Sequence, residues 1–297
     1  MSRFVLSTWN CFGAAQNLVS FVRWRGAPDS HRFDSPNLTE VVEEADVVCM
    51  QEVFLTEAEA FFSRLSHGHK RRDHNATTLW PLTFGGSGLG IASRFAIKAH
   101  GVHPFSRPHT GAERFARKGM LHAHLVVDEV DNIEIDVITT HLQSGYYGRA
   151  AHVRRRQVDQ LRELVATRSL KERATIICGD LNIDGLSEAK SRAEYDNLRN
   201  MLDEFADLGA HEDRPTFHPE PGVNDLAHRF EASSPPQRID YVLFRPGSSG
   251  DVRPTHCELS LNETLSGTDG TFPSDHFGLK ATFEIGPVTD RAERPSR

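Results

Sequence analysis

The sequence of 297 residues lacks several features that define common protein classes. No stretch approaches the roughly 18 consecutive apolar residues that a membrane-spanning helix requires. There is no excess of positive charge, because the net charge is −7, and this argues against avid, sequence-independent binding of nucleic acids. The amino-terminal stretch MSRFVLSTWNCFG shows no signal-peptide pattern, so we expect a cytoplasmic protein.

Cysteine is also scarce, and the few cysteines are widely spaced without any CxxC pair. They are Cys11, Cys49, Cys178 and Cys257. Most of them lie in apolar runs typical of strands, where a free cysteine behaves as a small apolar residue. We therefore expect reduced, mostly buried thiols, as in a cytosolic protein.

The composition that remains is typical of a globular protein, with 38% hydrophobic and 25% charged residues. There is no internal repeat and no long linker, so we predict a single domain over residues 1–285, and we expect a monomer. Residues 286–297 are polar and aperiodic, which predicts a disordered tail. Two basic stretches, 69–72 (HKRR) and 152–156 (HVRRR), are candidates for a local basic patch, although solvated loop and helix faces are the more ordinary interpretation.

Apolar runs predict strands that alternate with helical patterns. The predicted strands are 3–10, 46–52, 88–94, 119–127, 132–141, 175–181, 238–244 and 276–284. The clearest helix is 150–168, where Val158, Leu161, Leu164 and Val165 form one stripe, and shorter helices are predicted at 57–65 and 194–205. This mixture predicts an α/β fold with mixed sheets.

Polar residues end the apolar face of four predicted strands. Side chains two positions apart share a face of a sheet, so Phe4, Leu6 and Thr8 lead to Asn10. By the same spacing Val48 and Met50 lead to Glu52. The others follow the same rule: Ile133, Ile135, Val137 and Thr139 lead to His141, and Ile176 and Cys178 lead to Asp180 and Asn182. Asp184 shares this parity but lies beyond the strand, where a turn explains it.

Two later strands begin with the polar group, at Asp240 and at Asp275 with His276. If all these side chains share one rim, the two later strands run opposite to the first four. The collected carboxylates, amides and imidazoles favour a hard cation, Mg²⁺ or Mn²⁺. Two histidines beside carboxylates suit proton transfer near neutral pH. The implied reaction is attack of an activated water on a phosphoester.

Seven motifs in this order resemble the endonuclease/exonuclease/phosphatase superfamily over residues 3 to 285. They are STWN, MQEVF, SGLGIASRF, TTHLQSG, GDLNID, RIDYVL and SDHFGL. The resemblance implies a DNase I-like fold, which is a four-layer sandwich of two mixed β-sheets flanked by helices. It also implies that the chain is a metal-dependent phosphoric diester hydrolase.

The resemblance also implies a role for each matching residue. Glu52 matches the metal-ligating glutamate, with Asn10 beside it and Asp275 near the metal. His276 matches the histidine that activates the attacking water, and Asp240 its orienting partner. The remaining matches are Asp180 and Asn182, which position the nucleophile or protonate the leaving oxygen, and His141, which contacts the phosphate. Whether Asp180 or His276 is the base, and whether one or two metals bind, stays open.

Within the superfamily, the segments TTHLQSGYY and RKGMLHAHL resemble neutral sphingomyelinases. This implies a sphingomyelinase- or phospholipase C-like enzyme, with a phospholipid head group favoured over nucleic acid and transient contact with a membrane surface. Lys118 would then reach a phosphate oxygen, or else be an exposed strand lysine. A DNA or RNA nuclease is the alternative, and a phosphomonoesterase is a third possibility.

Some features weigh against the lipid interpretation. Residues 245–272 contain a single aromatic residue, Phe272, where secreted sphingomyelinases have an aromatic hairpin. Phe61 and Phe62 could supply an apolar membrane patch, but a buried helix face is the simpler interpretation. His122 and His124 share a strand face and suit either zinc or an ordinary polar pair. A catalytically inactive binding module would have lost site positions, and none of the eight is lost.

Overall fold

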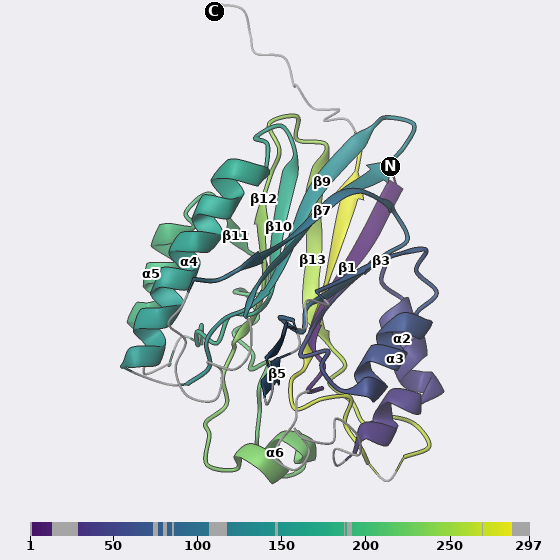
Figure 1. The fold of residues 1–297 in the computed structure, drawn as a ribbon, viewed down its shortest axis with the longest axis vertical. Helices are drawn as coiled ribbons and strands as arrows, with labels where there is room; N and C mark the ends of the chain where they lie inside the picture. The colour runs from purple at the N-terminus through teal and green to yellow at the C-terminus, as the bar shows by residue number, and fades with distance from the viewer. Residues whose placement is uncertain are drawn as a thin grey trace, which may run out of the picture.

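In the computed structural model, the described residues form a four-layer sandwich (Figure 1). They are residues 2–13, 29–73, 77–79, 82–84, 86–106, 118–145, 148–186, 188, 192–268 and 270–286. Two sheets face each other in the centre, with α4 (Arg149–Arg168) and α5 (Arg192–Met201) outside one sheet. On the other side lie α2 (Pro36–Glu43) and α3 (Thr56–Arg64). The predicted tail lies outside the described residues, apart from Gly286.

The first sheet has the strand order β13-β14-β1-β2-β6-β3. Its strands are β1 (Ser2–Asn10), β2 (Val47–Gln51), β3 (His69–Arg72), β6 (Gly90–Ser93), β13 (Val252–Ser260) and β14 (Gly278–Ile285). β1 and β2 are parallel, and β14 pairs with β1 in the antiparallel direction. The carboxyl ends of β1 and β2 therefore meet the amino end of β14 at one edge.

The second sheet has the order β11-β12-β10-β9-β8-β7. Its strands are β7 (Ala96–Pro104), β8 (Gly119–Asp128), β9 (Ile133–His141), β10 (Ala174–Asp180), β11 (Ala206–Asp207) and β12 (Asp240–Arg245). β9 and β10 are parallel, whereas β12 is antiparallel to β10. The prediction that β12 and β14 run opposite to the other site-bearing strands is confirmed. A separate hairpin joins β4 (Thr77–Leu79) to β5 (Leu82–Phe84).

The predicted helices are present, and the apolar stripe of α4 is buried as expected. The sequence patterns missed η1 (Ser30–Asp34), α2 and α6 (Asp225–Glu231), and also the strands β3, β4, β5, β7, β11 and β13. The basic stretch 69–72 is the strand β3 rather than a loop or helix face, while 152–156 lies in α4. In the described part of the chain, no helix has both the length and the apolar character needed to cross a bilayer.

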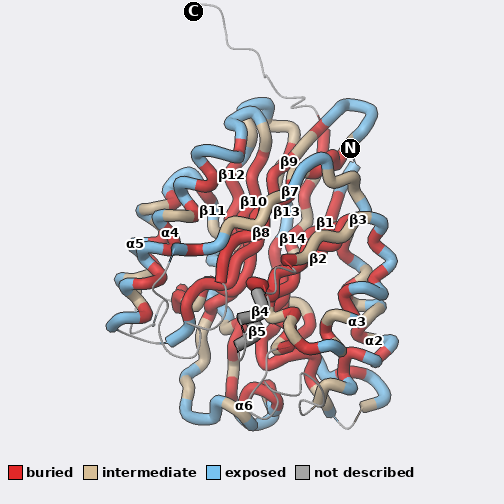
Figure 2. Tube along the Cα trace, in the orientation of Figure 1, coloured by how far each residue is buried: buried red, intermediate tan, exposed pale blue. Residues whose placement is uncertain are grey.

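The main core lies between the sheets, where the central strands β1, β2, β9 and β10 are largely buried (Figure 2). Phe4, Leu6, Ile135 and Ile176 belong to this cluster, so alternation was predicted correctly in β1, β9 and β10. Two further clusters lie under the α2–α3 and α4–α5 pairs. All four cysteines are buried and free, as predicted.

Candidate active site

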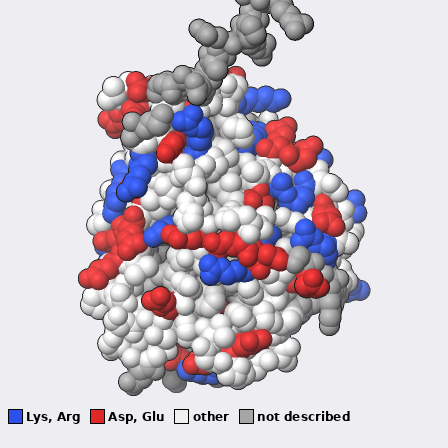
Figure 3. All heavy atoms as spheres, turned by 180° about the vertical axis from the view of Figure 1, so that it is seen from behind, with Lys and Arg blue, Asp and Glu red and all other residues white. Residues whose placement is uncertain are grey.

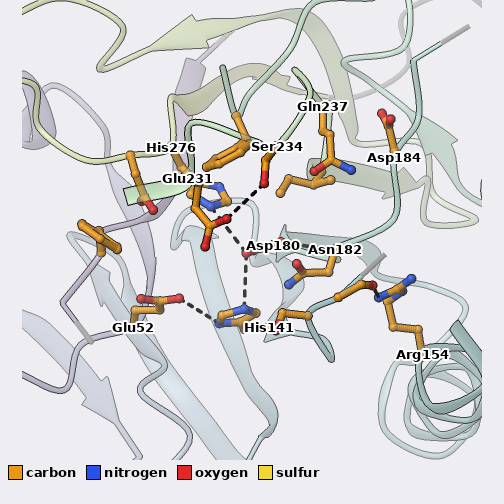
Figure 4. A pocket seen from close by; sticks show the side chains of 16 residues that line it. Glu52, His141, Arg154, Asp180, Asn182, Asp184, Glu231, Ser234, Gln237 and His276 are labelled. Carbon is orange, nitrogen blue, oxygen red and sulfur yellow. Dashed lines mark hydrogen bonds and ion pairs between the residues drawn. The ribbon is translucent and has the colours of Figure 1, made fainter. Parts of the chain in front are cut away.

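The site lies where the carboxyl ends of β1, β2, β9 and β10 meet the amino ends of β12 and β14. A pocket of about 360 Å³ opens there, and Glu52, His141 and Asp180 point toward one another in it (Figure 4). Asn182, Asp275 and His276 also line it. Asn10 and Asp240 lie behind the lining residues and bond to them. The structure therefore brings all eight predicted positions together.

Asp180 is the central carboxylate of this group. It ends β10, opposite His141 of β9 and Asp240 of β12 in the sheet register. Its Oδ2 accepts a hydrogen bond from Asn10 Nδ2 at 3.1 Å and lies 3.3 Å from His141 Nε2. Burial raises the pKa of Asp180 to about 6, against 3.8 in water. Its carboxylate is therefore ionised at neutral pH but titrates close to it.

His276 and Asp240 form a buried pair, in which the imidazole Nδ1 lies 2.9 Å from Asp240 Oδ2. This bond leaves His276 Nε2 toward the pocket, 3.9 Å from Asp180 Oδ2. Burial alone would lower the pKa of His276, but the carboxylates of Asp240, Asp275 and Asp180 together hold that pKa well above its usual value. The Phe217 ring lies 5.3 Å from the imidazole and covers it.

Glu52 reaches the pocket by a different route from the one that strand alternation predicted. β2 ends at Gln51, and Val48 and Met50 pack on the outer face of the sheet, under the helices. Continued alternation would have placed Glu52 on that outer face, so the parity argument was wrong for this residue. Its backbone instead has φ +59°, a left-handed conformation that costs a non-glycine residue free energy. This turn directs the carboxylate to Asn10 Nδ2, at 3.2 Å.

Asn182 also lies beyond its strand and has φ +52°. Its backbone N–H donates to Asp180 Oδ1 at 2.9 Å, and its Nδ2 donates to the carbonyl oxygen of Leu142 at 3.2 Å. Asp184 lines the pocket too, but its Oδ1 accepts from the backbone N–H groups of Leu186 and Arg238. The turn explanation for Asp184 is therefore confirmed.

Asp275 is held by the loop before β14. The Ser274 hydroxyl donates to the Asn10 carbonyl oxygen at 2.6 Å and lies 3.1 Å from Asp275 Oδ1. Asn224 Nδ2 donates to the carbonyl oxygens of Ser274 and Asp275, which fixes the loop backbone. Burial, together with the nearby Glu52 carboxylate, raises the pKa of Asp275 to about 7.

The residues present fit a hard divalent cation. Burial raises the pKa of Glu52 as well, although the charges of His276 and Lys118 act in the opposite direction. Glu52 also raises the pKa of Asp275, so two carboxylates lie close together in one pocket. Oxygen ligands of this kind suit Mg²⁺. Ligand atoms of Asp180, Asp240 and His276 also lie within 4.8 Å of one another. The pKa of His276 favours an imidazolium there, however, which cannot ligate a metal, so the Glu52–Asp275 side suits the ion better.

Lys118 is buried rather than exposed, so its interpretation as an ordinary exposed strand lysine is wrong. Its Nζ donates to the Leu142 carbonyl oxygen, just after His141. Burial, together with the charges of Lys118 and His276, lowers the pKa of His141 well below its usual value. His141 is therefore neutral at pH 7.

Sequence patterns missed several residues that hold the site. Thr216 Oγ1 accepts from the backbone N–H groups of Ile239 and Asp240, which fixes the start of β12. The buried Arg32 guanidinium donates to the backbone carbonyl oxygens of Cys11, just after β1, and of Pro273, before β14. Gln51 bonds across the two sheets. Only Gln51 had a sequence signal, since it stands beside Glu52 in the MQEVF motif.

Two other sequence hypotheses are resolved by packing. His122 bonds to Asp136 at 2.9 Å and His124 to Glu134 at 2.7 Å, and Arg173 donates to Asp136 as well. These are cross-strand hydrogen bonds to carboxylates, and in the described part of the chain neither histidine belongs to a group of three residues that could hold a metal ion. Phe61 and Phe62 lie on the buried face of α3, so the helix-core interpretation is confirmed for both.

Comparison with known proteins supports the assignment of the fold. A profile of the Endonuclease/Exonuclease/phosphatase family matches residues 7–276. No curated protein sequence matches the chain. Several solved structures resemble it over most of their length, although with low sequence identity.

A mutant beta toxin of Staphylococcus aureus with bound magnesium ions has a TM-score of 0.71 and 17% identity, covering 94% of this chain and 99% of that chain. TDP2 of D. rerio in complex with a single-strand DNA product has a TM-score of 0.70 and 18% identity, covering 96% of this chain and 100% of that chain. Sphingomyelinase C of Streptomyces griseocarneus has a TM-score of 0.65 and 21% identity, covering 95% of this chain and 99% of that chain. These likenesses bear out the predicted four-layer sandwich.

Proposed function

Because the chain belongs to the Endonuclease/Exonuclease/phosphatase family, we propose that it is a Mg²⁺-dependent phosphodiesterase with one catalytic domain over residues 1–285. Mn²⁺ is the alternative ion. The observation that carries the proposal is the convergence of Glu52, His141, Asp180 and His276, from both sheets, on one pocket. A bound divalent cation would stabilise the negative charge that develops on the phosphoryl oxygens.

Glu52 and Asp275 would hold the cation. Asn10 contributes mainly by orientation, because its Nδ2 donates to both Glu52 and Asp180 and its Oδ1 accepts from the Phe12 backbone N–H. The neutral His141 donates a ring N–H to a phosphate oxygen. Lys118 holds the loop after His141 and adds positive charge behind the phosphate.

Proton transfer falls to Asp180 and His276. Asp240 accepts from His276 Nδ1 and thereby fixes the ring with Nε2 toward the pocket. One of the two groups takes the proton of the attacking water, and the other protonates the leaving oxygen. Asn182, whose backbone N–H holds Asp180 Oδ1, keeps that carboxylate in its orientation and stabilises the transition state with its amide.

The charges around the pocket favour a phospholipid head group over a nucleic acid. Among the described lining residues, Arg154 is the one Lys or Arg side chain, and both of its outer nitrogens already bond to Glu194 or to backbone oxygens. On the face shown in Figure 3, acidic and basic side chains are interspersed without an extended basic area. A nucleic-acid backbone is bound mainly by clustered Lys and Arg. These features, with the sphingomyelinase-like motifs, support a sphingomyelinase- or phospholipase C-like activity.

Contact with the membrane would be superficial and transient. Val130 and Leu170 are the exposed large hydrophobic residues in the described part of the chain. Val130 lies in the β8–β9 turn and Leu170 precedes β10, so both are at the opposite strand ends from the pocket. The enzyme would therefore act on a head group that reaches into the pocket from the lipid surface.

A DNA or RNA nuclease is the second candidate, since TDP2 in complex with a single-strand DNA product has a TM-score of 0.70, close to the 0.71 of the beta toxin. The test is an assay of the purified protein with Mg²⁺ and with EDTA on sphingomyelin, lysophospholipid, plasmid DNA and a generic phosphodiester. We expect Mg²⁺-dependent release of choline phosphate. DNA nicking without that release would overturn the lipid proposal, and full activity in EDTA would overturn the metal mechanism.

A further inference from the structure

The proposed active site is divided between the two sheets. Asn10 and Glu52 belong to the sheet of β1 and β2, whereas His141, Asp180 and Asp240 belong to the sheet of β9, β10 and β12. Apolar packing between the sheets is not directional, so it sets their separation better than their relative shift. Catalytic groups that act on one substrate need placement within about 0.5 Å. A directional contact between the sheets near the pocket would fix their relative shift to that precision.

Gln51 makes such a contact. Its side chain lies between the sheets and is fully buried. Nε2 donates to Thr8 Oγ1 in the neighbouring strand of its own sheet, at 3.1 Å. The same nitrogen donates to Thr139 Oγ1 in the facing sheet, at 2.9 Å. One amide group therefore joins β1 and β2 to β9.

The position of this contact is as informative as its geometry. Thr8 and Thr139 each stand two residues before a site residue on the same strand face, Asn10 and His141 respectively. Gln51 itself directly precedes Glu52. The contact thus forms the row of side chains immediately beneath the pocket, and it touches both halves of the site.

The neighbouring strand β10 leaves room for the amide. Gly179 precedes Asp180, and a Cβ atom there would lie 3.3 Å from Gln51 Nε2 and 2.1 Å from the Thr140 carbonyl oxygen. No side chain could stand between Gln51 and β9 at this level. The absence of a side chain at Gly179 therefore lets the two sheets approach beneath the site.

We propose that Gln51 is a positioning residue, which fixes the metal-binding half of the site relative to the half that transfers protons. This inference rests on the proposed function. Of the two bonds that Gln51 makes, the bond to Thr139 carries the effect, because it is the one that crosses between the sheets, in the row beneath the bond from Asn10 to Asp180 that also crosses. The bond to Thr8 duplicates a connection that the parallel backbone pairing of β1 and β2 already makes.

The two threonines allow a matched test. Thr139→Val removes the bond between the sheets, and Thr8→Val removes the bond within one sheet, with the same change of side chain. We expect Thr139→Val to lower kcat about 10- to 100-fold with KM changed less than about threefold, since a displacement of about 1 Å costs that much. Thr8→Val should change kcat less than about threefold, and Thr139→Ser should recover most of the loss. Both valine variants should lower Tm by similar amounts.

Two further measurements do not depend on turnover. The affinity for Mg²⁺, measured by calorimetry, should be unchanged in Thr139→Val. Glu52 follows β2 and Asp275 precedes β14, both strands of one sheet, whereas Thr139 lies in the facing sheet. In crystal structures, the separation of Asn10 Nδ2 from Asp180 Oδ2, now 3.1 Å, should increase in Thr139→Val and not in Thr8→Val. Equal kcat in the two valine variants, or an unchanged separation, would overturn the role of Gln51. An inactive wild-type protein would instead overturn the proposed function.

Discussion

Buried ionisable groups that depend on one another characterise the site at the scale of single residues. Asp180, Asp240 and His276 are all buried, and each has a partner of opposite charge within 4 Å. An ionised group removed from water is costly unless it is paired. Truncation of one member should therefore impair both the chemistry and the state of the groups that remain.

The first prediction concerns His276. His276→Ala should lower kcat/KM by roughly three orders of magnitude or more, because it removes both a proton-transfer group and the charge paired with Asp240. His256→Ala, on the exposed side of β13, is the matched control and should leave kcat/KM unchanged. Steady-state kinetics with thermal melting would separate catalysis from stability. A loss below tenfold in a folded protein would mean that the site is misplaced.

A second prediction separates metal binding from proton transfer. Glu52→Gln keeps the size of the side chain but removes the charge that we propose holds Mg²⁺. It should weaken Mg²⁺ binding measured by calorimetry by at least about tenfold and reduce turnover by several orders of magnitude. The control is Glu44→Gln, an exposed glutamate paired with Lys280. Unchanged Mg²⁺ affinity in Glu52→Gln would count against the proposed ligand.

At the scale of elements, the ends of the strands decide which side chains enter the pocket. Asn10, His141, Asp180 and Asp240 lie within strands, so alternation predicted their faces correctly. Alternation is a property of extended backbone alone, and it fails where a strand ends. Glu52 follows a strand end and enters through a left-handed residue, a conformation that its residue type does not indicate.

The missed elements have a similar explanation. β13 and β3 are edge strands of the first sheet, and their residues are largely half-buried or exposed, so neither shows the apolar run of an interior strand. The side-chain contacts of Thr216, Arg32 and Gln51 join segments far apart in the chain. Local patterns contain no information on such pairings, whereas the order of the motifs was sufficient to predict the fold.

A third prediction tests the close approach at β10. Gly179 has φ +129°, and a Cβ atom there would collide with the Thr140 backbone. Gly179→Ala should therefore destabilise the protein by more than about 3 kcal/mol or prevent folding. Gly68→Ala is the control, since no atom lies within 4 Å of its added Cβ. Urea denaturation of both variants measures the difference, and similar midpoints would show that β10 can shift to make room.

At the scale of the whole molecule, the raised carboxylate pKa values link folding to pH and to metal. In the metal-free protein the pKa of Asp180 is about 6 and that of Asp275 about 7, against 3.8 for each in the unfolded chain. Between these values the native state holds protons that the unfolded state has lost. The contribution of these two groups to the free energy of unfolding therefore decreases as the pH rises from about 4 to about 7.

His276 and His141 change the pH dependence of the free energy of unfolding in opposite directions. The raised pKa of His276 gives stability below the unfolded value of 6.5, and that stability is lost as the pH rises through its folded pKa. The lowered pKa of His141 opposes this only below pH 6.5, where the unfolded chain binds a proton that the native state does not. Above pH 6.5 the contributions of Asp275 and His276 therefore act together.

The fourth prediction is that, in EDTA, Tm falls between pH 6.5 and pH 8. Mg²⁺ should raise Tm more at pH 8 than at pH 6.5, because a cation binds the ionised carboxylates and competes with their protons. Asp275→Asn should reduce both the fall in EDTA and the difference in the Mg²⁺ effect, since its amide does not titrate. Thermal melts at the two pH values, with and without Mg²⁺, provide the measurement. A Mg²⁺ effect equal at both pH values would show that the ion binds away from these carboxylates, and the pocket would then need another explanation for its excess of acidic groups.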